Sequence, residues 1–117
     1  MELKKINETI TVSPQITAGD MPEIKRAGFG AIICNRPDGE GSDQPAFDEI
    51  AAAAKAAGLD ARYVPVRPGA VEDADVAAFG DAVRDLKGPL LAYCRSGARS
   101  ATMWSLFARS DAAVAHR

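Results

Sequence analysis

The residues best suited to chemistry lie in one stretch, Cys94–Ser100, which reads Cys-Arg-Ser-Gly-Ala-Arg-Ser. An apolar run, Leu90–Tyr93, comes directly before it, and a helical pattern follows from Ala98. Backbone N–H groups at a helix N-terminus bind anions, and they favour the thiolate form of a nearby cysteine. Gly97 allows the backbone to curl around a small anion, since it has no side chain. The pattern predicts a nucleophilic cysteine in an anion-binding loop.

The side chains of this loop take separate predicted roles. Cys94 is the predicted nucleophile, and Arg99 is predicted to stabilise the bound anion. The further binding residues predicted in the loop are Arg95, Ser96, Gly97, Ala98 and Ser100. The alternative is a buried cysteine beside two surface arginines, which does not account for a glycine and two arginines within seven residues.

A second polar loop, Asn35–Gln44, follows another apolar run, Gly30–Cys34. Arg36 in this loop is predicted either to bind an anionic substrate or to hold Asp38. Asp38 is the candidate general acid for a reaction that needs one. A turn pinned by its own side-chain hydrogen bonds would explain the same residues, and this alternative stays open. Cys34 is expected in the core, with a resolving thiol for the nucleophile as the alternative.

Short apolar runs alternate with longer helical patterns along the chain. The expected strands are Ile10–Ser13, Gly30–Cys34, Ala61–Val66 and Leu90–Tyr93, and the expected helices span about 17–27, 45–57, 72–86 and 98–109. This alternation predicts a single α/β domain with a mostly parallel sheet of about four to five strands flanked by helices. Ligands of such sheets bind beyond the carboxyl ends of the strands, where both polar loops begin.

Length and composition restrict the class of protein. The 117 residues fit one domain, expected over 1–117 with its core at about 10–109. A formal net charge of −2 argues against nucleic-acid binding, and no apolar run is long enough to span a membrane. The N-terminus shows no apolar signal segment, so a cytoplasmic protein is expected. The predicted chemistry needs no metal and no organic cofactor.

Two families share motifs with this chain. The run Tyr93–Ser100 looks like the active-site loop of rhodanese-type sulfurtransferases. From about Ile10 to Phe107 the chain resembles the phosphatase-like domain of bacterial beta-lactamase hydrolase-like proteins. The segments that carry this second resemblance are Ser13-Pro14-Gln15, Asn35–Glu40, Gln44-Pro45, Val64–Val66 and Pro68-Gly69. It implies the fold of protein tyrosine phosphatases, and members of the family are labelled either phosphatase-like or sulfurtransferases.

Loop length separates the two activities that these resemblances imply. Tyrosine phosphatases place five residues between the cysteine and the arginine, whereas four residues separate Cys94 from Arg99. They carry histidine before the cysteine, where this chain has Tyr93, and its only histidine, His116, is not expected near the site. Their general acid follows the preceding strand, but residues 65–70 contain neither Asp nor Glu.

We therefore expect a cysteine-dependent sulfurtransferase of the rhodanese type, which forms a persulfide on Cys94 and needs no general acid. A phosphatase with a phosphocysteine intermediate is the alternative, and a non-catalytic persulfide carrier or anion-binding module is a third interpretation. The expected ligand is a small anionic sulfur donor or a phosphate ester. Relatives fused to sulfide-metabolising enzymes imply such an enzyme as a partner.

Overall fold

The computed structural model describes residues 1–115. The strands are β1 (Lys4–Lys5), β2 (Ile10–Ser13), β3 (Ala31–Cys34), β4 (Asp60–Tyr63) and β5 (Leu90–Tyr93). The helices are α1 (Met21–Arg26), α2 (Phe47–Ala56), α3 (Asp73–Asp85) and α4 (Ala98–Ala115), with a short 3-10 helix at Ala18–Asp20 before α1. The alternation of strands and helices confirms the predicted α/β class.

The strands form one five-stranded sheet in the order β1-β2-β5-β3-β4. The four longer strands are parallel, and only β1 runs antiparallel, at the edge beside β2. Ser13, Tyr93 and Cys34 lie side by side as the last residues of β2, β5 and β3. The loops that begin at Pro14, Asn35 and Cys94 therefore leave the same edge of the sheet.

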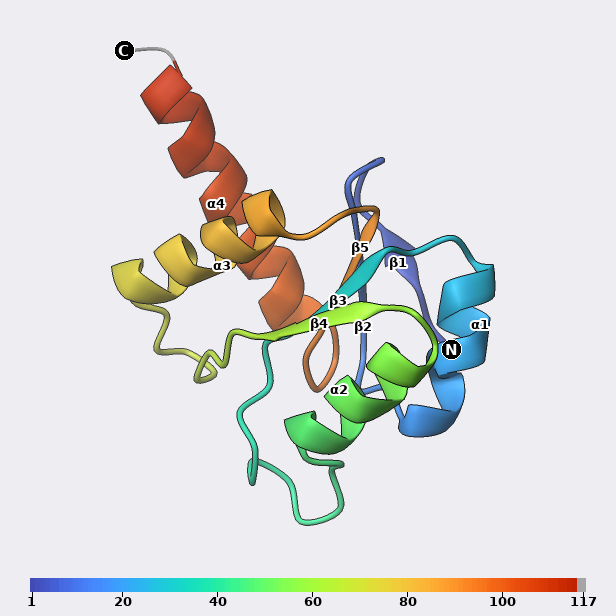
Figure 1. The fold of residues 1–117 in the computed structure, drawn as a ribbon. Helices are drawn as coiled ribbons and strands as arrows, with labels where there is room; N and C mark the ends of the chain where they lie inside the picture. The colour runs from blue at the N-terminus through green and yellow to red at the C-terminus, as the bar shows by residue number, and fades with distance from the viewer. Residues whose placement is uncertain (116–117) are drawn as a thin grey trace.

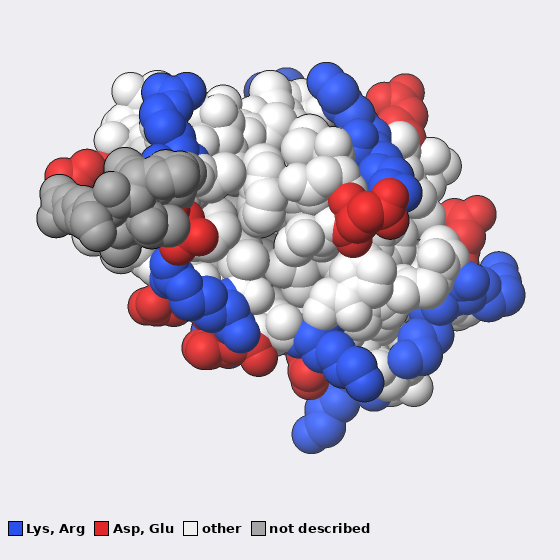
Figure 2. Space-filling model, turned by 90° about the horizontal axis from the view of Figure 1, so that it is seen from above, with Lys and Arg blue, Asp and Glu red and all other residues white. Residues whose placement is uncertain are grey.

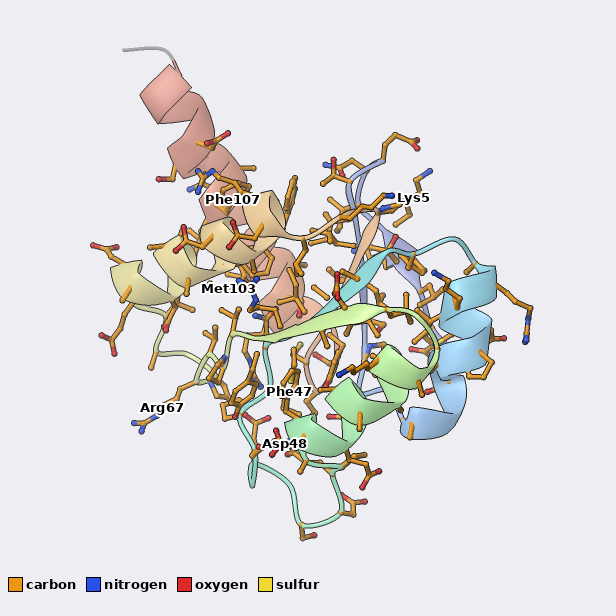
Figure 3. The ribbon with its side chains drawn as sticks, in the orientation of Figure 1. Lys5, Phe47, Asp48, Arg67, Met103 and Phe107 are labelled. Atoms are coloured by element: carbon orange, nitrogen blue, oxygen red, sulfur yellow. The ribbon has the colours of Figure 1, made fainter. Side chains whose placement is uncertain are left out.

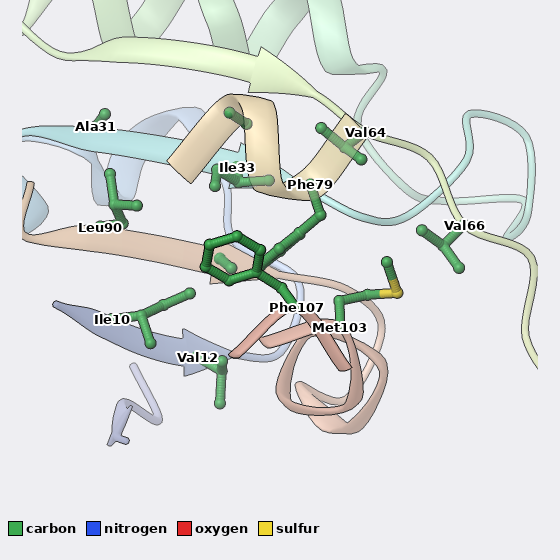
Figure 4. Close-up of a cluster of buried hydrophobic side chains, with 12 residues drawn as sticks. Ile10, Val12, Ala31, Ile33, Val64, Val66, Phe79, Leu90, Met103 and Phe107 are labelled. Carbon is green, nitrogen blue, oxygen red and sulfur yellow. The ribbon is translucent and has the colours of Figure 1, made fainter. Parts of the chain in front are cut away.

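Helices cover both faces of this sheet (Figure 1). On one face α3 and α4 enclose a core in which Phe79 and Met103 are fully buried and Phe107 is nearly so. These side chains lie over Ile33 and Leu90 of the central strands (Figure 4). Complete burial of one such side chain contributes about 1.5–3 kcal/mol. A second core forms between the other face and α1 and α2, so the central strands are apolar on both sides, as a covered parallel sheet requires.

Several element boundaries differ from the prediction. β4 ends at Tyr63 rather than Val66, although Val64 and Val66 still donate to the backbone carbonyls of Cys34 and Asn35. α2 begins at Phe47, whose N–H donates to the Asp38 carboxylate at 2.8 Å. α4 continues beyond the predicted end to Ala115. The two-residue strand β1 was not predicted, since a segment of that length carries no pattern. His116 lies outside the described residues.

Basic and acidic side chains are mixed on the face seen in Figure 2, around a centre without charged residues. No patch of a single sign dominates this face. Among the described residues, no helix is long and apolar enough to cross a membrane.

Candidate active site

The Cys94 loop is fixed to the neighbouring strand before it turns into α4. The Cys94 N–H donates to the Ser13 carbonyl at 3.4 Å, and the Gln15 N–H donates to the Arg95 carbonyl at 3.3 Å. Gly97 has a φ of +95°, and a Cβ there would lie 3.2 Å from the Ser13 carbonyl carbon. Only glycine fits this position, because both the positive φ and the close approach exclude a side chain.

The Cys94 sulfur lies inside the turn that this glycine makes. The Gly97 N–H donates to Cys94 Sγ at 3.0 Å, which favours negative charge on the sulfur. The residue is only 1% exposed, yet it lines a cavity of about 400 Å³. The other residues of that cavity come from the loop, from α4 and from the segment after β4: Pro68, Gly69, Val71, Ser96, Ala98, Arg99 and Thr102. The sulfur is thus buried in protein but open to a small ligand.

Several backbone N–H groups around the cavity remain available to an anion. In the described part of the chain, no hydrogen bond uses the N–H of Arg95, Ser96, Arg99 or Ser100. The Ala98 N–H is bonded, at 3.3 Å, to the Ser96 hydroxyl. Four unpaired donors at the N-terminus of an 18-residue helix form the kind of anion site that the sequence predicts.

The Arg99 side chain enters the same cavity and is held from one side only. Nη1 donates to the carbonyls of Asn35 at 3.3 Å and Val66 at 2.9 Å. Nη1 and Nη2 together bind both oxygens of the Glu40 carboxylate, each at 3.0 Å. Among the described residues none accepts a hydrogen bond from Nε. The Nε edge of a fixed guanidinium is therefore available to an oxyanion.

Glu40 joins Arg99 to the second polar loop. Its Oε1 also accepts a hydrogen bond from Arg36 Nε at 3.2 Å, and Arg36 Nη1 donates to Gln15 Oε1 at 3.0 Å. Hydrogen bonding to Arg99, with a smaller contribution from Arg36, lowers the pKa of Glu40 below its ordinary value. The two arginines that the sequence predicts are thus brought together through Glu40, which the sequence offers only as one of several carboxylates near enough to be considered as a general acid.

The sequence carried a weak signal for Glu40. It stands four residues after Arg36 in a loop at the carboxyl edge of the sheet, but that spacing implies contact only in a helix. In this loop the backbone turns back on itself, so that the Glu40 carboxylate lies 3.2 Å from Arg36 Nε. A Cβ on Gly41 would lie 2.7 Å from Arg36 Nη2, so a glycine allows the loop to fold over the guanidinium.

The Ser100 hydroxyl binds Asn35 and not the Cys94 sulfur. Its hydroxyl donates to Asn35 Oδ1 at 2.8 Å, and Asn35 Nδ2 donates to the Val64 carbonyl at 2.9 Å. Ser100 and Asn35 are both fully buried. This chain of bonds fixes the first turn of α4 to the ends of β3 and β4, which keeps the anion-binding loop in place.

Asp38 and Cys34 lie apart from the cavity. Asp38 is exposed, accepts the Phe47 N–H at the start of α2 and does not line the Cys94 cavity. Asp38 therefore caps α2 and does not contribute a carboxylate to the Cys94 cavity. Cys34 is 2% exposed and packs in the core on the α2 side, as expected, with its Sγ 3.3 Å from the Arg36 carbonyl. Burial raises the pKa of the Cys34 thiol.

Acidic and metal-binding groups are sparse at this site. Of the residues that line the Cys94 cavity, none is Asp or Glu.

Arg67 lies on the segment between β4 and α3 but points away from the molecule (Figure 3). Over residues 1–111, no group of three potential metal ligands comes together. A larger hollow of about 700 Å³ between α3 and α4 contains no cysteine.

The fold and the cysteine–arginine loop together define the class as an α/β domain with the architecture of protein tyrosine phosphatases. The solved structure of Tk-PTP shares this fold, with a TM-score of 0.63, 17% identity, and coverage of 82% of this chain and 62% of that chain. Residues 2–112 match the phosphatase-like domain of beta-lactamase hydrolase-like proteins. The chain belongs to that family.

Two relatives illustrate how similar the chain is to members of this group. A beta-lactamase hydrolase-like protein from Agrobacterium fabrum is 37% identical over 106 residues, which cover 91% of this chain and 25% of the relative. The chain therefore spans about a quarter of the length of the curated relatives that it matches. A candidate phosphatase from Neisseria meningitidis is 36% identical, with a TM-score of 0.82 over 89% of this chain and 74% of that chain.

These comparisons correct the predicted activity. The four-residue spacing and the lack of an acid in residues 65–70 predict sulfur transfer, and this prediction is wrong, because the family and the similar structures are phosphatase-like. The spacing does not keep the arginine away from the nucleophile. α4 begins at Ala98, so Arg99 lies in its first turn and reaches the Cys94 cavity.

Proposed function

We propose that this protein is a cysteine-dependent phosphatase that hydrolyses phosphomonoesters at Cys94. One observation carries the proposal. Cys94 and Arg99 line the same small cavity together with Ser96, and the N–H groups of Ser96 and Arg99 have no partner in the described part of the chain. A thiolate, a guanidinium edge and a ring of amides are the groups that a phosphoryl transfer needs from the protein.

The reaction proceeds in two displacements. The Cys94 thiolate attacks phosphorus, an S–P bond forms, and the P–O bond to the leaving group breaks. The leaving alkoxide or phenoxide takes a proton from water. A second water then attacks phosphorus, the S–P bond breaks, and inorganic phosphate and a proton leave while the thiolate is restored. The loop amides hold the equatorial oxygens in both steps.

Arg99 supplies the fixed positive charge for both transition states. Its contacts with Glu40, Asn35 and Val66 hold the guanidinium before substrate arrives, so little reorganisation accompanies the reaction. The edge that carries Nε binds the phosphoryl oxygens. Glu40 acts as a positioning residue because it touches the arginine and not the substrate.

The lack of a carboxylate in the cavity lining limits the ester that can react. A leaving group that departs without a strong general acid must itself be a weak base. We therefore expect aryl phosphates, and other esters of acidic leaving groups, to react much faster than alkyl phosphates. Hydrolysis of such activated esters needs only the nucleophile and the anion site.

A series of aryl phosphates tests this function. The wild-type chain is assayed on aryl phosphates whose phenols differ in acidity, with Cys94→Ser as the inactive control. We expect phosphate release that falls steeply as the phenol becomes less acidic, and a phosphorylated Cys94 in the intact mass of acid-quenched enzyme. Release of no phosphate from any ester would refute the proposal. A flat dependence on leaving group would show that a general acid acts.

A further inference from the structure

We propose that the site takes substrates with two neighbouring phosphate groups, one over Cys94 and the other in a second cavity lined by Arg36 and Arg95. This inference rests on the proposed phosphatase function and names its substrate class. This second cavity has a volume of about 620 Å³, and its lining includes Thr17, Arg36, Glu40, Ser42, Asp43 and Arg95.

Consecutive residues of the Cys94 loop line the two cavities. Arg95 directly follows Cys94, and its exposed side chain lines the second cavity while the cysteine lines the first. Arg36 Nε and Arg99 Nη2 donate to the same oxygen of Glu40, at 3.2 and 3.0 Å. One carboxylate oxygen thus links the guanidinium that lines the first cavity to the one that lines the second.

Arg36 gives the second cavity a prearranged cation. Its side chain is 8% exposed, with Nε bound to Glu40 and Nη1 bound to Gln15. No described residue accepts a hydrogen bond from Nη2, and no buried side-chain nitrogen in the described part of the chain lacks a partner. Nη2 is therefore not completely buried, and Arg36 lines the second cavity. A fixed guanidinium with an open donor is suited to a phosphate oxygen.

The other polar side chains of the second cavity are compatible with a bound anion. The hydroxyls of Thr17 and Ser42 donate to no described residue, so both can donate to a ligand. The Glu40 carboxylate is already shared between Arg36 and Arg99. Asp43 is the other acid of the lining, and it is exposed, where water screens its charge. Arg36 and Arg95 thus provide the donors for a second phosphate.

The experiment compares two ligands that differ by one phosphate. Binding of 2,3-bisphosphoglycerate and of 3-phosphoglycerate to the Cys94→Ser chain is measured by calorimetry at constant ionic strength, so that no turnover occurs. The readout is the ratio of the two dissociation constants. In the Cys94→Ser background we expect a preference for the bisphosphate of about tenfold or more, which corresponds to one charge-assisted contact.

Arg95→Gln, added to Cys94→Ser, is expected to reduce this ratio by about tenfold. The matched control is Arg26→Gln, which removes an exposed arginine of α1 and is expected to leave the ratio unchanged. An unchanged ratio with Arg95→Gln, or an equal loss with Arg26→Gln, would overturn the proposal. Because binding is measured without turnover, failure of this subsite is distinct from failure of the phosphatase activity, which the aryl phosphate assay reports.

Discussion

Cys34 is the last residue of β3 and Cys94 directly follows the neighbouring parallel strand β5, but the two sulfurs have different surroundings. Cys34 and Cys94 are both free and almost fully buried. The Cys34 sulfur lies 3.3 Å from the Arg36 carbonyl oxygen in the core, and burial raises the pKa of its thiol. The Cys94 sulfur receives a backbone N–H and opens into a cavity. Burial alone therefore does not decide the chemistry of a thiol; the local peptide dipoles and the access of ligand do.

Replacement of either sulfur gives the largest contrast. Cys94→Ser should reduce phosphatase activity on the order of 10³-fold or more, since a neutral hydroxyl without a base is a weak nucleophile. Cys34→Ser should retain activity within about threefold, because the hydroxyl can still donate to the Arg36 carbonyl. Initial rates with an aryl phosphate, together with circular dichroism of both variants, check the prediction. Comparable losses in both variants would remove the distinction between the two thiols.

Arg99 shares a cavity with Cys94 but not with Cys34, and its replacement should have the next largest effect on activity. Arg99→Lys keeps the charge but loses the planar edge that binds an oxyanion while the other edge binds Glu40. We expect kcat to fall by about 10²–10³-fold. Arg62→Lys is the matched control, because this exposed arginine pairs with Asp85 away from the site. A loss below about threefold in Arg99→Lys would show that the amides alone bind the phosphoryl group.

Alkylation measures the same contrast without any substrate. Iodoacetamide near neutral pH should label Cys94 about tenfold or more faster than Cys34, because only the sulfur of Cys94 receives an N–H and lines a cavity. Inorganic phosphate should slow the labelling of Cys94 and leave that of Cys34 unchanged. Peptide mass spectrometry over time separates the two sites. Equal labelling rates would contradict the assignment of Cys94 as the reactive thiol.

The sequence predicts the fold that the structure shows, but its prediction of the activity is wrong. Periodicity predicted the central strands, and the apolar run before Cys94 placed it at a strand end, because these features are local. The role of Glu40 was missed, since its contacts with Arg36 and Arg99 depend on how two loops meet. The count of residues between Cys94 and Arg99 was misleading for a similar reason. The residue at which α4 begins, and not the spacing alone, decides whether the Arg99 side chain reaches the cavity.

Glu40 offers the smallest but most specific test of the contrast, since it supports the Cys94 side of the site and has no counterpart at Cys34. In the native protein Arg99 and Arg36 lower the pKa of Glu40 below its ordinary value of 4.5. A depressed pKa contributes stability above the unfolded value, and that contribution is lost as the pH falls through the folded value. Glu40→Gln should lower the free energy of unfolding by about 1 kcal/mol near neutral pH, since the side chain is 19% exposed and partly screened.

The pH dependence separates this charge effect from a packing effect. Below pH 4.5 the native Glu40 begins to protonate, so the difference in stability between the wild type and Glu40→Gln should shrink as the pH is lowered further. Denaturant unfolding of both chains at neutral pH and at several values below 4.5 measures the difference directly. A difference that stays constant over this range would mean that the glutamine disturbs packing. In that case the carboxylate would not be what holds Arg99 beside Cys94.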